Sequence, residues 1–489
     1  MMAKPELHED NETLERRRVL YLLAQAVEKL YRLREILGRQ RTFVEANRNQ
    51  SEYAGVIDPL AGELEEQAEV LRRNSSRIAS FLRNKPLDEQ GKTALSGILQ
   101  KVINVVLGLH EVLILLPRET VEPQVFHVLQ DCFGEEWRPS SVIMSNALTS
   151  YEYRIEDVLE NLKDLGQNEL THWKGLLKGF TRSGSVLAQA FVDRDNPLAW
   201  SVLAHEYGHA LDEARGISRQ VVHGDQASGG ECSAEDPAVK WTAEIFADFV
   251  AARVLGPASQ IPILLLEMSR PSLVSVLDEA PSHPPTTVRL GLVREYMKEL
   301  NVSTDGFEEV FELYSFDYAR KLAELAEKER SVRKEVEKMV ESLQSRVKAV
   351  AAQVNSLKLH PFGDQQLDHA RELQKKLQSD LPVSSLRQTA DDRMLAELNS
   401  LVESKADRER VYEVLSGFNE VPAASAEILT AGWLYKLGSF EERLKETFPE
   451  VGSPHKVNLD QYGAYLARTD ELLLRSIELT AVHAEIIRG

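Results

Sequence analysis

The segment VLAHEYGHALDE (residues 202–213) constrains the fold more than any other, because it sets two histidines and a glutamate in the order H-E-x-x-H. It contains no proline and a single glycine, so it predicts a helix. Side chains four residues apart share one face of a helix, so His205 and His209 can present their imidazoles to one metal ion. Glu206 projects about 100° away from His205, where it can reach a water molecule beside the ion without being a ligand itself.

A metal ion that catalyses hydrolysis needs a third protein ligand, with the fourth position left to water. A third histidine six residues after His209 would be typical of the metzincin arrangement, but that residue is Arg215. Cysteine is a poor candidate, because the chain has only Cys132 and Cys232, too few for a Cys-rich zinc site. The third ligand must therefore be an acid or a histidine from elsewhere in the chain.

A second predicted helix, DPAVKWTAEIFADFVAARVLGP (residues 236–257), offers better candidates. It opens with Asp236 as N-cap and Pro237 at the first helical position. Glu244 and Asp248 lie four residues apart and share one face, beside apolar residues. Such a pair is also typical of a solvated helix face, but the apolar surroundings favour a role in the site. Glu244 would be the third metal ligand, and Asp248 would hydrogen-bond a ligand histidine and fix its tautomer.

These two segments and a third one resemble the gluzincin metallopeptidases. HEYGH followed by EIFAD is similar to the gluzincin pattern, in which the third ligand is a glutamate in an E-x-x-x-D context. SHPPTTVRL (residues 282–290) is similar to the H-P-x-x-x-x-R-[IL] segment of the HtpX-like branch, and it contains His283 and Arg289. EIFADFVAARVLGP also resembles the corresponding helix of ImmA/IrrE-type peptidases, although Asp248 stands where asparagine is usual. The resemblance covers about residues 185–295, under a quarter of the chain, without the membrane-spanning helices of HtpX-like enzymes.

The resemblance implies a zincin-like fold and a zinc-dependent endopeptidase. One zinc ion per chain would be held by His205, His209 and Glu244. A ligand set of two histidines and a glutamate favours zinc among the first-row metals. The metal would polarise a peptide carbonyl, and Glu206 would take the proton from the attacking water and pass it to the leaving amine.

Further groups would complete such a site. His283 is the candidate donor to the negative charge that develops in the transition state, and Arg289 would support it or contact a substrate carboxylate. Tyr207 is a weaker donor, because its position on the helix can direct it into the core. The predicted strand near residues 188–192 could add the substrate as a further strand, and the loop at 222–235 is either a lid or a plain connection.

The chain of 489 residues is long enough for several domains, and its pattern is mainly α, with α+β character overall. Apolar residues at three- and four-residue spacing predict an N-terminal helical region over residues 1–117. Strand-like runs at 141–144 and 186–192 predict a small β-sheet, so that residues 118–306 would form a zincin-like metallopeptidase domain. Residues 307–489 would form a C-terminal helical domain.

A heptad-like seam marks the C-terminal domain. Its apolar residues are spaced 4, 3, 4, 4, 3, 4 and 3 residues apart: Val332, Val336, Met339, Leu343, Val347, Val350, Val354 and Leu357. We favour an intramolecular hairpin, in which residues 365–377 return after the turn HPFG and pack on the seam. The alternative is that the seam joins two copies of the chain in a homodimer.

Composition narrows the function classes. The formal net charge of -19 argues against a general binder of nucleic acid, because such proteins contact phosphates through lysine and arginine. The N-terminus lacks the apolar core of a signal peptide, and the most apolar run, at residues 102–117, is shorter than a membrane span and carries His110 and Glu111. Two cysteines fit a reducing compartment. We therefore expect a cytoplasmic protein without a membrane span, acting on a protein or peptide.

Two other functions remain open at this point. A non-enzymatic helical scaffold or interaction protein could keep the metal site for stability alone, in which case four protein ligands would be expected. A regulated protease could cut one specific partner, such as a repressor, as the likeness to ImmA/IrrE-type peptidases suggests. Glu206 favours an enzyme over a scaffold, because a purely structural site has no use for a base at that position.

Overall fold

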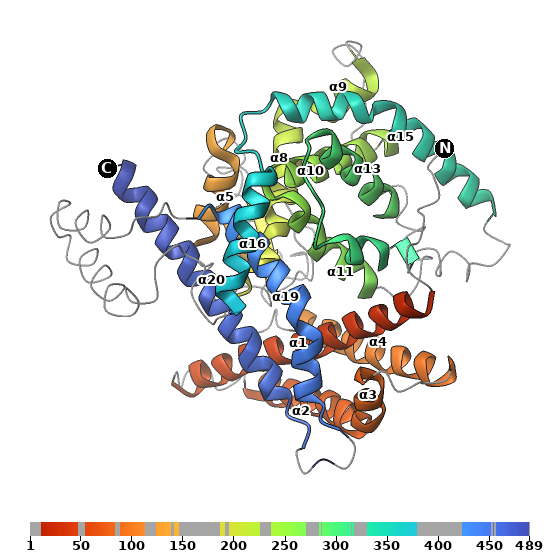
Figure 1. Cartoon of the computed structure of the whole chain (residues 1–489), viewed down its shortest axis with the longest axis vertical. Helices are drawn as coiled ribbons and strands as arrows, with labels where there is room; N and C mark the ends of the chain where they lie inside the picture. The colour runs from red at the N-terminus through yellow and green to blue at the C-terminus, as the bar shows by residue number, and fades with distance from the viewer. Residues whose placement is uncertain are drawn as a thin grey trace.

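The structure of the chain, a computed structural model, is described for residues 11–46, 54–83, 89–112, 124–137, 141–145, 186–190, 195–224, 236–269, 283–284, 286–313, 315–316, 330–378, 423–450, 453 and 456–488. Over these residues the regular structure is helical except for one short pair of strands (Figure 1). The mainly α prediction is confirmed. Within the same residues, no helix combines the length and the apolar character that crossing a membrane requires.

The N-terminal region is built from α1 (Asn11–Ala46), α2 (Ala54–Arg73), α3 (Ser75–Leu82) and α4 (Glu89–Val112). α1 packs on both α2 and α4. The apolar spacing in the sequence is the spacing of the buried face of α1, which includes Leu20, Leu23, Val27 and Leu30. The apolar run that begins at Val102 lies in α4 as far as Val112, and the side chains of Val102, Ile103 and Val106 are buried in the core.

The prediction of a zincin-like core with a small β-sheet is wrong. β1 (Ser141–Ser145) and β2 (Val186–Ala190) lie where strands were expected, but they form only a two-stranded parallel pair. No further strand occurs among the residues that the structure describes. Two strands of five residues bury too little surface to act as a layer of a core. Other helices cover the segment that contains the H-E-x-x-H motif instead.

The centre of the molecule is a group of helices around α10 (Pro237–Leu255), seen in green in Figure 1. α10 is buried on nearly all sides, as its continuous apolar sequence requires. The helices that pack on it include α8 (Ser201–Arg215), α9 (Ile217–His223), α13 (Thr286–Glu299) and α15 (Arg330–Ser356). Shorter elements complete this part: α5 (Gln124–Phe133), η3 (Gly134–Glu136), η5 (Pro197–Trp200), η7 (Gly256–Gln260) and α11 (Ile261–Ser269).

The predicted C-terminal seam lies in α15 (Arg330–Ser356), and it packs mainly on α10 and α9. Its described side chains are buried or half-buried: Leu343, Val347, Val350, Val354 and Leu357. The side chains of three further seam residues lie outside the described part: Val332, Val336 and Met339. The returning segment forms α16 (Asp364–Gln378), which packs on α19 (Ser425–Thr447) instead. The described part of the seam therefore packs on the central helix of its own chain, and not on the returning segment as the hairpin required. The homodimer stays a prediction.

α1 and α20 (Leu459–Arg488) bring the N-terminal and C-terminal helices together (Figure 1). Between α1, α19 and α20 lies the α1–α20 charge cluster, which consists of Glu28, Arg32, Lys436 and Asp470. Lys436 Nζ donates to the two Glu28 oxygens at 2.8 and 2.7 Å. Arg32 donates from Nε to Glu28 at 3.1 Å and from Nη1 to Asp470 at 2.8 Å. The four side chains are at most 13% exposed. The predicted domain boundaries stay a prediction.

Candidate metal centre

α8 and α10 cross closely enough for their side chains to share one site. A Cβ atom at Gly208 in α8 would lie 2.7 Å from the Cα atom of Ala247 in α10, which is closer than two carbon atoms can approach. A side chain at position 208 would therefore force the two helices apart. Because position 208 is glycine, the face of α8 that carries His205 and His209 meets the face of α10 that carries Glu244.

Three side chains converge at this crossing. Nε2 of His205 lies 3.0 Å from Nε2 of His209. The oxygens of Glu244 complete the group, with Oε2 3.5 Å from Nε2 of His205 and Oε1 3.3 Å from Nε2 of His209. The ligand atoms of a tetrahedral zinc ion, each about 2.0–2.1 Å from it, lie about 3.3 Å apart. The three residues could therefore hold a metal ion.

Asp248 determines which nitrogen of His205 faces the site. Its Oδ1 atom is fully buried with the rest of the side chain and lies 3.0 Å from Nδ1 of His205. The charge of a carboxylate at that distance favours a proton on Nδ1, which leaves Nε2 to bind a metal. Asp248 thus has the position predicted for it, although the two atoms are not aligned as in a hydrogen bond. The donor set of two imidazoles and one carboxylate, with one imidazole oriented from behind, fits zinc.

Arg289 holds both carboxylates of α10. Its Nε and Nη2 atoms donate to the two oxygens of Asp248 at 2.7 and 2.9 Å. Its Nη1 atom lies 3.1 Å from Oε2 of Glu244. The side chain is only 9% exposed, so a substrate carboxylate has little access to it. Of the two roles expected for Arg289, its contacts fit support of the site.

The charges of the metal-free site follow from burial and from these contacts. Burial opposes charge on His205, but Asp248 and Glu244 raise its pKa to about 10. Burial lowers the pKa of His209, although Glu244 acts in the opposite direction. Burial also disfavours the charged form of Glu244, yet nearby positive groups, Arg289 among them, hold the pKa of its carboxyl well below the usual range. Without a metal, a proton on Nε2 of His205 can thus bridge to His209.

Glu206 and Tyr207 follow His205 on α8 and project in other directions. Glu206 is half-buried, and its role as the general base stays a prediction. Tyr207 is buried, and its hydroxyl donates to the backbone oxygen of Glu136 at 3.0 Å. Its ring packs edge-on against Phe133, with the ring centroids 4.4 Å apart. Tyr207 therefore anchors α8 in the core, and the structure does not bring it to the ligand atoms.

His283 lies at the edge of the site. Its side chain is 55% exposed, and its Nε2 atom is 3.4 Å from Oε1 of Glu244. The next residue, Pro284, is buried. His283 does not belong to the group of three ligands. Its position therefore suits contact with a substrate better than coordination of the ion.

Two predicted parts of the site fall partly outside the described residues. The proposed lid is described only up to residue 224, and residues 225–235 lie outside. The substrate-binding strand was placed at residues 188–192, but β2 ends at Ala190. β2 pairs with β1 along its whole length, so one of its two edges is already occupied.

Two important residues of this region were missed or underrated from the sequence. Gly208 was noticed only as the weak point of a helix, whereas it is the contact residue of the crossing. A signal existed, because the facing helix carries small residues around Ala247. Glu136, which anchors Tyr207, lies in the short turn η3, and no local pattern marks it.

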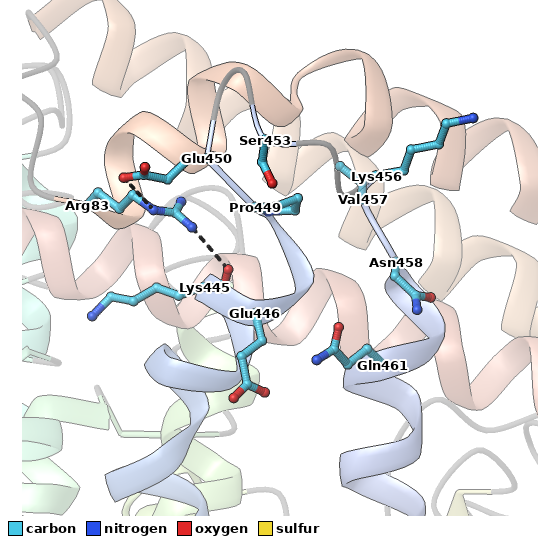
Figure 2. A pocket seen from close by; sticks show the side chains of 10 residues that line it. All are labelled: Arg83, Lys445, Glu446, Pro449, Glu450, Ser453, Lys456, Val457, Asn458 and Gln461. Atoms are coloured by element: carbon cyan, nitrogen blue, oxygen red, sulfur yellow. Dashed lines mark hydrogen bonds and ion pairs between the residues drawn. The ribbon is translucent and has the colours of Figure 1, made fainter.

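A large cavity lies away from the metal centre, where the ends of α3 and α19 meet the start of α20 (Figure 2). Its volume is about 1090 Å³. Figure 2 shows Arg83 directed toward Glu450, at 3.2 Å, and toward the carbonyl oxygen of Lys445, at 3.3 Å. Arg83 also donates to the carbonyl oxygen of Phe448 at 3.0 Å. This arginine therefore caps the end of α19, and we assign the cavity no ligand.

A scan of protein-family models and searches of curated proteins and of solved structures found no match to this chain. The likeness to gluzincins therefore rests on the short segments that carry it. The function has to be argued from the geometry of the site.

Proposed function

We propose that the chain is a zinc-dependent endopeptidase that hydrolyses peptide bonds with Glu206 as the general base. The observation that carries the proposal is the set of ligand atoms 3.0 to 3.5 Å apart at the crossing of α8 and α10. A glutamate directly after the first ligand histidine supports an enzyme, because a structural site needs no base there. The segments that resemble gluzincins support the same reaction.

His205, His209 and Glu244 would hold the zinc ion, and three protein ligands leave one tetrahedral position for water or substrate. When bound, zinc supplies a Lewis acid that makes water more acidic and polarises a carbonyl group. Glu206 would accept the proton of the attacking water and deliver it to the leaving amine. Asp248 would keep Nδ1 of His205 protonated and the ring in place.

His283 and Arg289 would have different tasks in this reaction. His283 is exposed at the edge of the site, so it would donate a hydrogen bond to the carbonyl oxygen as negative charge develops there. Arg289 is buried against Asp248 and Glu244, so it would fix these two carboxylates. Removal of either residue should therefore lower activity through different parameters, the catalytic step for His283 and metal affinity for Arg289.

The proposed substrate is a protein or a peptide. The net charge of -19 disfavours nucleic acid. The likeness to ImmA/IrrE-type peptidases supports a regulated protease that cuts one protein partner. Only two cysteines in 489 residues favour a reducing compartment, so we propose the cytoplasm as the location.

Metal content is the first test. Wild-type protein and the His209→Ala variant are purified side by side, and their zinc content is measured by elemental analysis. We expect about one zinc ion per wild-type chain and a large loss in the variant, because one of three ligands is gone. No zinc in either protein, even after zinc is added, would contradict the metal site.

Activity is the second test. A quenched fluorescent casein is incubated with zinc-loaded wild type and with Glu206→Gln. We expect Glu206→Gln to bind zinc as wild type does and to lose activity by at least about a hundredfold, because the base is gone. Equal activities would remove Glu206 from the mechanism. Zinc binding without activity on casein or on an unstructured peptide library would favour the helical scaffold.

A further inference from the structure

The connection between α15 and α16 contacts η3, α5 and α10, and we call residues 357–363 the strap. In Figure 1 it runs from the end of α15 down past α5 to α16. Its backbone is bonded to three different elements. The N–H of Lys358 donates to Oε1 of Glu136 at 2.9 Å, in η3. The N–H of His360 donates to the carbonyl oxygen of Cys132 in α5 at 3.3 Å, and that of Phe362 to the carbonyl oxygen of Arg253 in α10 at 2.7 Å.

Two glycines in left-handed conformations receive the rings of the strap. Gly134 has a φ of +53°, and a Cβ atom there would lie 2.7 Å from the ring of His360. Gly256 has a φ of +59°, and a Cβ atom there would overlap the ring of Phe362. Both positions need glycine for their backbone conformation and for the close approach of a ring. Two rings of the strap therefore pack directly against the backbone of η3 and η7.

Glu136 joins the strap to the helix that carries the ligand histidines. It is only 6% exposed, so each of its contacts is shielded from water. Its backbone oxygen accepts from the hydroxyl of Tyr207, and its Oε2 atom pairs with Nη2 of Arg215. Both of these partners belong to α8. Its other carboxylate oxygen accepts from the N–H of Lys358 in the strap.

The strap thus bridges the two helices whose spacing sets the geometry of the metal ligands. It reaches α8 through Glu136 and α10 through the carbonyl oxygen of Arg253. His205 and His209 come from α8, and Glu244 comes from α10, so a change in helix spacing changes the distances between ligand atoms. The strap reaches α8 through the Glu136 contacts with Tyr207 and Arg215.

We propose that the strap and the metal site are coupled through Glu136: docking of the strap holds α8 and α10 at the spacing that metal binding needs, and metal binding in turn holds the strap in place. Glu136 is then a positioning residue for the metal ligands. Coupling between two sites is reciprocal, so each event must favour the other by the same factor. Any partner or modification that lifts the strap would weaken the metal site. The inference rests on the proposed metal site and is independent of the reaction at that site.

The test compares Glu136→Gln with Glu135→Gln. Glu135 is the neighbouring acid and touches the same strap residue, since it accepts from Nζ of Lys358 at 2.7 Å, but it is exposed. Zinc affinity is measured by competition with a chelator. We expect Glu136→Gln to weaken zinc binding roughly ten- to a hundredfold, the effect typical of residues that orient metal ligands, and Glu135→Gln to leave it within about twofold of wild type.

Amide hydrogen exchange in residues 357–363 is the second readout, with and without zinc. We expect zinc to slow exchange of the strap in wild type and in Glu135→Gln, and to have little effect in Glu136→Gln. A purely structural role of Glu136 would speed exchange equally with and without zinc. Because Glu136→Gln risks misfolding, a second variant, Arg215→Met, removes only the ion pair between α8 and Glu136. Arg215 is 41% exposed, so this exchange disturbs the core less. It should weaken zinc binding less than Glu136→Gln but measurably.

The outcomes separate this proposal from the proposed function. The coupling would be overturned if Glu136→Gln and Arg215→Met both bound zinc within twofold of wild type. It would also be overturned if zinc did not change the amide hydrogen exchange rate of the strap in wild type. Coupling without hydrolysis of casein would overturn the peptidase and leave the coupling intact. A wild-type chain that binds no zinc would overturn both.

Discussion

The candidate metal centre and the α1–α20 charge cluster are both built from buried charged side chains, yet only the charge cluster balances its carboxylates with lysine and arginine alone. In that cluster, Glu28 and Asp470 face Arg32 and Lys436, so two negative charges meet two positive ones. Each group has an opposite partner within 3.1 Å. The three helices α1, α19 and α20 are thereby fixed to one another.

The metal centre has a different balance. Glu244 and Asp248 share the single guanidinium of Arg289, and their other partners in the site are imidazoles. Two of the imidazole nitrogens face each other at 3.0 Å. The site balances its two carboxylates with Arg289 and with a proton on His205, whose pKa is raised to about 10. A metal ion can take the place of that proton, so the site is suited to a cation. The comparison teaches that permanent charges serve the fold, whereas a charge balanced by an exchangeable proton can serve a ligand.

Matched exchanges of a carboxyl for an amide would break the comparison most severely. Glu244→Gln removes the charge of the proposed metal ligand, and we expect zinc affinity to fall at least about a thousandfold, equivalent to about 4 kcal/mol. Asp470→Asn makes the same chemical change in the charge cluster and should leave zinc affinity unchanged. Competition with a chelator measures both variants. Wild-type affinity in Glu244→Gln would show that the carboxylate is no ligand.

Two variants that each add one methyl group would sharpen the comparison between the two regions. Gly208→Ala places a methyl group against the backbone of Ala247, which cannot turn away, so we expect a loss of about 3 kcal/mol in the free energy of unfolding and weaker zinc binding. Gly463→Ala in α20 meets the ring of Tyr31, a half-buried side chain that can rotate. It should cost about 1 kcal/mol and leave zinc binding unchanged.

Urea unfolding of the metal-free proteins gives the free energy of unfolding, and competition with a chelator gives the zinc affinity. If both glycine variants lost the same stability and neither changed zinc affinity, the close crossing of α8 and α10 would not control the site. Far-ultraviolet circular dichroism of each variant confirms that the helices are still formed.

Proton linkage gives the smallest expected effect, and it concerns the charge cluster alone. Burial raises the pKa of Asp470 to about 6, although Arg32 acts against this shift. The folded state therefore holds a proton here that the unfolded state releases between about pH 6 and pH 4. This raised pKa contributes stability that is fully present below the unfolded pKa and lost as pH rises through about 6.

The measurement is urea unfolding of wild type and Asp470→Asn from pH 7 to pH 4. The free energy of unfolding of wild type should rise relative to that of the variant by about 1–2 kcal/mol as pH falls over this range. A difference that stays constant with pH would mean that Asp470 titrates like an exposed acid. Zinc affinity of the two proteins should remain equal at each pH.

The two clusters also differ in how far the sequence could predict them. The ligand histidines are four residues apart, and Glu244 and Asp248 are four apart, so each half of the metal centre is a local helical pattern. In the charge cluster Arg32 pairs with Asp470, which is 438 positions away in the sequence, and no local spacing can predict such a pair. The sequence pattern did not show how α8 and α10 come together. That depends on the close contact between Gly208 and Ala247.

The fold was predictable to the same local extent. Apolar periodicity located α1 and α15, because each buried face repeats along its own helix. The absence of helix breakers located α8, and an N-cap followed by proline located the start of α10. The periodicity of α15 indicated that its seam is buried, but it could not say against what, and the seam packs on α10 and α9, whereas α16 packs on α19. The expected zincin-like sheet came from the resemblance to gluzincins and from short strand-like runs, and two such runs formed only β1 and β2.

The burial of α10 on nearly all sides has a consequence for the stability of the protein against degradation in the cell. An ion held by Glu244 is held by the helix at the centre of the molecule. A ligand that binds only the folded chain stabilises it by about 4 kcal/mol when its free concentration is about a thousand times its dissociation constant. Chains synthesised during metal shortage would open more often and meet cellular proteases first. The abundance of the protein would then follow the supply of metal, without a dedicated regulator.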